Sequence, residues 1–276
     1  MDSIIAQASL TLTGMPSEEA RQLPAFPGRD HWFSSTVQTA LSMILSWKQT
    51  LALDDALDTW YQFSLSRIIN RVSRQDSETR YVAREKHFAS DEVAQLFVES
   101  LGYAKVYLKT RGPLVGSSQA AWADSSTHIP IADGSVDCVI TSPPYANTMD
   151  YYLYHKQRMN ILGYDFKGVQ NTEIGSRWEY SSLKKPLSQW NDQYKNTLSE
   201  IRRILRENAT CVIIIGDSQI AGTLVDAAEL TADLSSTVGF CTLSVTSTNM
   251  TERSRSFSRA FQRPHKREHI IALSAV

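Results

Sequence analysis

The sequence has few cysteines, no long apolar run and almost no net charge, and each of these absences excludes a class of protein. Its three cysteines, Cys138, Cys211 and Cys241, show no CxxC or Cys/His spacing, so we expect buried, reduced thiols and no metal site. No apolar run is long enough to span a membrane. The first ten residues lack the basic start of a signal peptide. These features favour a cytoplasmic protein.

The net charge of −1 excludes a chain that is basic throughout. Positive charge is instead concentrated in an expected hairpin over residues 250–269, where the basic residues are Arg253, Arg255, Arg259, Arg263, Lys266 and Arg267. A run of this kind favours contact with nucleic-acid phosphates. The alternative is an ordinary solvated loop.

Composition divides the chain into three parts. Residues 1–30 contain several prolines and glycines and indicate an extended arm. Residues 31–110 have apolar side chains at helical spacing, which predicts helices over 34–47, 55–72 and 90–102. In residues 111–276, apolar runs alternate with amphipathic segments. This alternation indicates an α/β sheet.

Within residues 111–276 the pattern predicts individual elements. The expected strands are 119–123, 136–141, 211–216, 240–248 and 268–273, and the clearest helix covers 187–205. Residues 136–141 are nearly continuous in apolar character, which is typical of a buried parallel strand. The last two strands are expected to form an antiparallel pair.

The strand at 136–141 runs into Thr141-Ser142-Pro143-Pro144-Tyr145. Proline cannot continue strand pairing and makes the turn rigid. In an α/β sheet, ligands bind at the carboxyl ends of strands. The Ser142 hydroxyl and the Pro143 carbonyl can accept hydrogen bonds, and the Tyr145 ring can stack on a flat group. This combination suits an exocyclic amine on a nucleobase that has left the duplex.

The stretch TSPPY resembles motif IV of the amino-group DNA methyltransferases, which use S-adenosylmethionine. Four segments are similar to other parts of these enzymes: HWFSSTVQTAL at 31–41, residues 133–163, IRRILRENATCVIIIGDSQIAG at 201–222 and HKREHIIALS at 265–274. The resemblance implies a Rossmann-like class I methyltransferase sheet in a bacterial or phage protein near the nucleoid, with double-stranded DNA as the substrate. It favours cytosine N4 as the target and leaves adenine N6 as the second choice.

The resemblance also implies roles for individual residues. Ser142, Pro143, Pro144 and Tyr145 would hold the target base. The cofactor would contact Asp124, Thr141, Ser142 and Asp217, although a structural cap of the next helix is the favoured interpretation of Asp217. The segment 163–186 would be a target-recognition insertion, with Arg177, Lys184 and Lys185 as DNA contacts, or an ordinary long connection. Arg67, Arg71 and Arg74 fit a solvated helix face better than a DNA contact.

One part of the family pattern is missing from the sequence. The F-x-G-x-G loop, whose glycines let the backbone approach the cofactor, has no counterpart, because no two glycines are separated by a single residue. We therefore favour one subunit of a split methyltransferase, a heterodimer whose partner supplies the cofactor loop and completes the partial sheet. The alternatives are a non-catalytic DNA-binding or regulatory subunit and a gene fragment.

Overall fold

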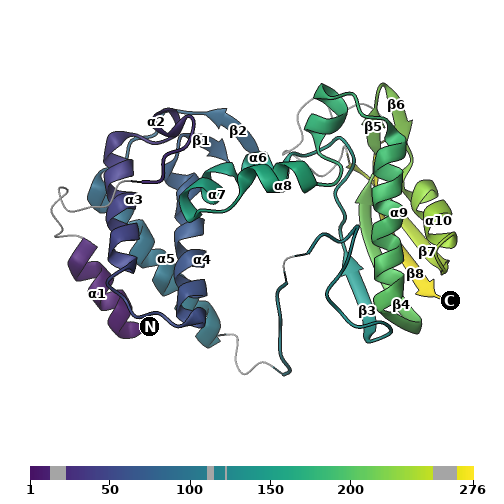
Figure 1. The fold of residues 1–276 in the computed structure, drawn as a ribbon, viewed down its shortest axis with the longest axis horizontal. Coiled ribbons are helices and arrows are strands. Elements are labelled where there is room, and N and C mark those ends of the chain that lie inside the picture. The colour runs from purple at the N-terminus through teal and green to yellow at the C-terminus, as the bar shows by residue number, and fades with distance from the viewer. Residues whose placement is uncertain (13–22, 111–114, 122, 251–265) are drawn as a thin grey trace. The chain divides into compact units, whose positions relative to one another are not determined.

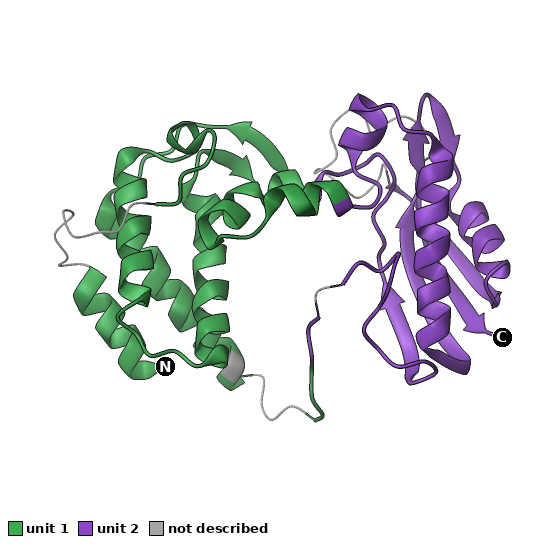
Figure 2. Ribbon diagram, in the orientation of Figure 1, with its two compact units in different colours: residues 1–118, 152–171 green, residues 119–151, 172–276 purple. Residues whose placement is uncertain are grey.

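The computed structural model describes residues 1–12, 23–110, 115–121, 123–250 and 266–276. The chain divides into two compact units (Figure 1, Figure 2). Unit 1 comprises Met1–Ser118 and Tyr152–Asn171, and unit 2 comprises Gln119–Tyr151 and Thr172–Val276. The division differs from the expected boundary at residue 111, since residues 152–171 return to the helical unit.

Unit 1 is mainly helical. Its elements are α1 (Asp2–Leu12), α2 (Arg29–Trp32), α3 (Ser35–Lys48), α4 (Asp55–Val72), β1 (Gln75–Ser77), β2 (Arg80–Ala83), α5 (Ser90–Thr110), α6 (Tyr151–Tyr154), α7 (Lys156–Leu162) and α8 (Phe166–Thr172). The side chains of Ser34 and Asp54 accept N–H hydrogen bonds from Val37 and Leu57 at the starts of α3 and α4, which is why these helices begin where the sequence predicts.

Two predictions for unit 1 were wrong. Residues 2–12 form α1 rather than an extended arm, because Ala8 and Leu12 are buried in the same core cluster as the helices α3 to α5. Helix α5 does not stop at Gly102 but continues to Thr110. Leu101 and Ala104, on either side of this glycine, are buried, and burial of this size outweighs the cost of about 1 kcal/mol for glycine within a helix.

Unit 2 contains the mixed sheet. Its elements are β3 (Val136–Thr141), η2 (Trp178–Ser182), α9 (Leu187–Ile204), β4 (Leu205–Gly216), β5 (Ser218–Ile220), β6 (Thr223–Val225), α10 (Ala227–Ser236), β7 (Phe240–Asn249) and β8 (Arg267–Ala275). The main sheet has the order β3-β4-β8-β7. Strand β3 is parallel to β4, while β8 is antiparallel to both β4 and β7. The parallel pair and the antiparallel pair are as predicted.

One face of this sheet is covered by helix α9, which lies in front of it in Figure 1 and contacts α10. Cys211, Ile213 and Ile215 of β4 are buried in this core, while Val212 and Ile214 between them are partly exposed. The alternation follows from the period of two along a strand. It shows that only one face of the sheet is fully covered by the described residues.

Strand β3 lies at an edge of the sheet. The sequence predicted a buried strand here, and this prediction was wrong, because no residue of β3 is fully buried. Its Ile140 side chain is 73% exposed, and Cys138 is also exposed. Cys241 is exposed as well, so of the three free cysteines only Cys211 fits the expectation of a buried thiol. The expected strand at 119–123 is absent from the described residues of that segment. None of the described helices is long and apolar enough to cross a membrane.

Candidate active site

The turn Ser142–Tyr145 follows β3 directly, at the carboxyl end of the parallel pair. Thr141, the last residue of β3, is in register with Ile213 of β4, and β4 ends three residues later at Gly216. The turn and the end of β4 therefore lie at the same edge of the sheet. This is the position at which α/β sheets bind ligands.

The Tyr145 ring packs against the backbone of Gly216. A Cβ atom at Gly216 would lie 2.7 Å from Cε2 and 2.9 Å from Cδ2 of Tyr145, so any larger residue would displace the ring. The Tyr145 hydroxyl donates a hydrogen bond of 2.7 Å to Oε1 of Glu268 on β8. Burial and the Glu268 carboxylate both raise the pKa of Tyr145 well above its usual value, so the phenol is neutral and remains a donor.

Asn147 ties the chain after Tyr145 to three other segments. Its N–H donates to the Gly175 carbonyl at 2.9 Å, its Nδ2 donates to the Gln219 carbonyl at 2.7 Å, and its Oδ1 accepts from Ser181 Oγ at 2.9 Å. The φ angle of Asn147 is +56°, which asparagine tolerates better than most residues. The chain is therefore held directly after Tyr145.

A cavity of about 500 Å³ lies beside β3, between this edge strand and α9. One end is formed by Thr141, Ser142, Pro143 and Pro144. Most of its remaining wall is apolar; this part is lined by Ile129, Ile131, Val136, Val139, Ile174, Trp190, Ile201 and Ile204. The predicted catalytic turn thus borders an apolar cavity at an open sheet edge.

Asp217, a predicted cofactor contact, is 2% exposed and surrounded by donors. Its Oδ1 accepts from the N–H of Ala227 at 3.0 Å and from Nε2 of His269 at 2.9 Å, and its Oδ2 accepts from the N–H of Arg267 at 2.9 Å. Burial alone would raise the pKa of Asp217, but these hydrogen bonds together lower it. The three bonds join the end of β4 to α10 and β8, while the N-cap of α10 is Asp226, whose side chain accepts from the N–H groups of Ala228 and Glu229; a cofactor contact of Asp217 stays a prediction.

Asp217, Asp226 and His269 bring ligand atoms within 4.8 Å of one another, which is close enough for a metal ion. Arg267 occupies the same cluster, with Nη2 donating to Asp226 Oδ2 at 2.6 Å. A guanidinium in this position opposes a further cation. The cluster is better explained as a hydrogen-bonded junction of the sheet with α10.

Asp124 lies in a turn, and the described residues directly before it, 119–121 and 123, form no strand. Its Oδ1 accepts hydrogen bonds from the N–H and Oγ of Ser126, which is the usual arrangement of an Asx turn. Ser125, its neighbour, lines the same cavity as Ser142. The structure therefore places Asp124 beside the predicted site.

The predicted DNA contacts differ in how available their charges are. Arg177 is half exposed and lies 3.5 Å from Asp150, and Lys184 is exposed. Lys185 donates a 2.5 Å hydrogen bond to the buried Glu179, and Lys266 is only 8% exposed, with burial lowering its pKa. The other predicted contacts, Arg253, Arg255, Arg259 and Arg263, lie outside the described residues.

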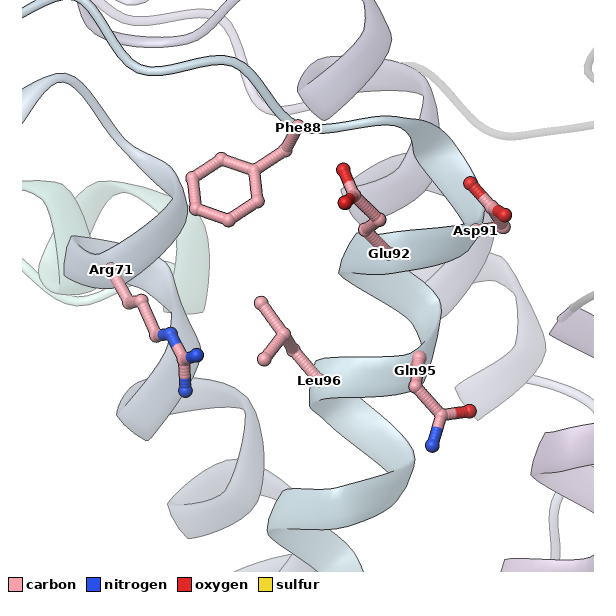
Figure 3. Close-up of a pocket in the computed structure, with 6 residues that line it drawn as sticks. All are labelled: Arg71, Phe88, Asp91, Glu92, Gln95 and Leu96. Atoms are coloured by element: carbon pink, nitrogen blue, oxygen red, sulfur yellow. The ribbon is translucent and has the colours of Figure 1, made fainter.

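The basic residues at the end of α4 have local roles in unit 1. The Arg67 guanidinium lies 3.8 Å from the ring centroid of Tyr103, and Arg74 bonds to the carbonyls of Asp30 and His31. Arg71 borders a hollow of about 450 Å³ with Phe88 and Leu96, opposite the acidic start of α5 (Figure 3). These contacts lie within unit 1, and the preference for a solvated helix face over a DNA-binding face stays a prediction.

Two residues around Tyr145 are not apparent from the sequence alone. Gly216 and Glu268 form one rung of the sheet, since they are paired in register on β4 and β8. The local signal at Gly216 was only a glycine at a strand end. Glu268 is 123 residues away from Tyr145 in the chain, so no local pattern could indicate this contact.

Comparison with known proteins gives a match in the same region. Residues 136–271, which comprise most of unit 2 and the segment 152–171 of unit 1, match the model of a family described as DNA methylase. The type II methyltransferase M.MjaII of Methanocaldococcus jannaschii is 29% identical over 84 residues, which cover 30% of this chain and 15% of that protein. These matches support the relation to amino-group DNA methylases that the sequence indicated.

Solved structures give a weaker likeness. TTHA0409 of Thermus thermophilus, assigned as a DNA modification methylase, is 16% identical with a TM-score of 0.34, over 55% of this chain and 52% of that chain. The [4+2]-cyclase SpnF covers 98% of this chain and 92% of its own, with 12% identity and a TM-score of 0.33. Likeness at this level carries no functional conclusion. The chain spans about half of TTHA0409 and a small part of M.MjaII.

Proposed function

We propose that this chain is the catalytic-motif subunit of a DNA methyltransferase. It methylates the exocyclic amine of a flipped base, with cytosine N4 favoured over adenine N6, and it acts with a partner subunit. The observation that carries the proposal is the Ser142–Tyr145 turn at the carboxyl end of β3, within the region that matches the DNA methylases.

The turn supplies the groups that such a reaction requires. The Ser142 hydroxyl and the Pro143 carbonyl accept the hydrogen bonds of the target amine, whose lone pair is otherwise delocalised into the ring. Tyr145 stacks on the base, which must leave the duplex to reach the turn. Fixing the amine in this orientation lowers the barrier by proximity.

The methyl donor is S-adenosyl-L-methionine, which supplies an electrophilic methyl group when bound. In this chain, Thr141 and Ser142 form the polar end of the 500 Å³ cavity and would face the donor there. The rest of the lining is largely apolar, and the sequence has no GxG loop. The described residues therefore fit one wall of a cofactor site, and the other wall belongs to the partner.

The edge of β3 supports the partner. In the described sheet no strand pairs with the outer side of β3, although Ile140 and Cys138 are exposed on it. An unpaired edge with apolar side chains is a site of association unless another strand covers it. A partner strand on β3 would cover this edge and bring the missing loop next to the turn.

DNA binding by the exposed Arg177 and Lys184 is part of the proposal. These residues flank η2, in the segment that follows the turn along the chain. The basic run at 251–265 would add phosphate contacts. Contacts of this kind weaken steeply with salt, so the salt dependence of DNA binding should become shallower in Arg177→Ala.

The decisive experiment mixes the purified chain, DNA and tritiated S-adenosylmethionine, with and without the product of the neighbouring gene. We expect tritium in DNA only when both chains are present. Full activity of the chain alone would refute the partner requirement. Ile140→Asp should weaken the complex in gel filtration, whereas Leu224→Asp, an equally polar change at an exposed leucine of β6, should not.

A non-catalytic DNA-binding subunit is the second candidate, favoured by the missing glycine loop. Ser142→Ala separates the two functions. In an enzyme it should abolish tritium transfer by the complex and leave DNA affinity unchanged. A complex that methylates normally with Ser142→Ala would refute the catalytic assignment of the turn.

A further inference from the structure

We propose that Glu268 is a positioning residue, which holds the Tyr145 ring in place beside the turn that carries Ser142. The proposal rests on the proposed function for its catalytic consequence, but its structural part can be tested without DNA. It concerns the contact between the strand β8 and the turn that follows β3.

The geometry places both supports of Tyr145 on one rung of the sheet. Glu268 pairs with Gly216 on one side and with Thr248 on the other. The ring of Tyr145 lies against Gly216, and its hydroxyl reaches Glu268 at 2.7 Å. The ring is therefore held along its Cδ2–Cε2 side by a residue without a side chain and at its tip by a carboxylate.

A second consequence follows from the chemistry of the carboxylate. An ionised Glu268 can only accept hydrogen bonds, so the Tyr145 hydroxyl must donate to it. The bond of 2.7 Å therefore fixes the direction of the Tyr145 hydroxyl and, with it, the tip of the ring.

Holding the ring also reduces the cost of binding. A tyrosine without this bond has freedom at both side-chain torsions, which stacking on a base would have to remove. Pro143 and Pro144 restrict only the backbone of the turn. The position of Glu268 therefore completes a site in which the backbone of the turn and the ring of Tyr145 are both set before the base arrives.

The structural part is tested on the isolated chain with tyrosine labelled at ¹³Cζ. The Tyr145 resonance is assigned by its loss in Tyr145→Phe. We expect Glu268→Ala to shift this resonance and to let Tyr145 ionise at lower pH. Glu207→Ala removes an exposed carboxylate of β4 that pairs with Arg202 and should change neither. An unmoved Tyr145 signal in Glu268→Ala would overturn the proposal.

The catalytic part is tested on the complex by a double-mutant cycle. Glu268→Ala should lower kcat by about 10²-fold, the size expected for a misplaced reacting group, with DNA affinity within about twofold. In a Tyr145→Phe background the same change should add no further loss. An equal loss in both backgrounds would overturn the proposal, because Glu268 would then act without the Tyr145 hydroxyl.

Two controls separate the possible failures. If Glu268→Ala does not fold, Glu268→Leu, which keeps the bulk of the side chain but has no acceptor, replaces it, and we expect the same shift of Tyr145 and a similar loss of kcat; unchanged values would overturn the proposal. If the wild-type complex transfers no methyl group while Tyr145 still responds to Glu268, the proposed function fails and the positioning contact stands.

Discussion

Asp217 offers the sharpest test of how the sheet is joined to its helix, since its two oxygens accept hydrogen bonds from Ala227, His269 and Arg267. Asp217→Asn keeps the size of the side chain but replaces one oxygen by an amide NH₂. In whichever orientation the amide settles, at least one buried donor faces another donor. Leaving one such group without an acceptor costs about 1–3 kcal/mol.

The assay is hydrogen exchange of peptides from β8 and α10, which reports the free energy of local opening. A loss of about 1–3 kcal/mol corresponds to about 5- to 150-fold faster exchange in these segments. The matched control is Asp137→Asn on β3, whose side chain is 77% exposed and pairs with Arg206; a surface pair contributes about 0–1 kcal/mol.

Unchanged exchange in Asp217→Asn would refute the structural role of this residue. If cofactor affinity of the complex fell at the same time, the cofactor contact that the family resemblance implies would be the correct reading. A large effect of Asp137→Asn would show that the assay does not distinguish buried from exposed carboxylates.

Three further predictions concern unit 2. The Arg203 side chain, with the N–H of Ile129, lowers the pKa of Glu200 to about 2, so its stabilising effect is present above about pH 4.3 and is lost as pH falls toward 2; Glu200→Gln should remove this pH dependence from the exchange of residues 129–135. Leu198→Ala, at a fully buried position of α9, should cost about 2–5 kcal/mol, measured by denaturant unfolding followed by α9 exchange. Asn147→Ala should destabilise the turn by about 1–3 kcal/mol, and Asn147→Gly by less, because glycine accepts the positive φ angle; equal exchange of residues 143–150 in both variants would contradict this reasoning.

The elements that were predictable are those with a complete local pattern. Helix α9 has apolar side chains at every turn of one face, and the apolar run that ends at Gly216 could only be a strand. Segment 2–12 failed because its short apolar pattern becomes a helix only when Ala8 and Leu12 are buried in the core of unit 1. Tertiary packing decided this element, and packing is not visible in a local window.

The site was predictable in the same limited sense. The turn at 142–145 can be recognised from the sequence, since two prolines after an apolar strand are unusual. The residues that contact the turn cannot be recognised in this way. Glu268 contacts Tyr145 because β8 pairs with β4, and this pairing is set by the topology of the sheet. The division of the chain into two units could not be predicted either, because nothing in the sequence pattern of 152–171 shows that this segment packs with α4.

That division has a consequence for the order of events during synthesis. Unit 1 needs residues 152–171, so it can be completed only after β3 and the turn have left the ribosome. At that moment β4, the neighbour of β3, has not been made, since it begins at Leu205. Domains generally fold as units while the chain emerges. Strand β3 therefore has no partner strand during the interval between the completion of unit 1 and the synthesis of β4. A nascent chain would most need a chaperone during this interval.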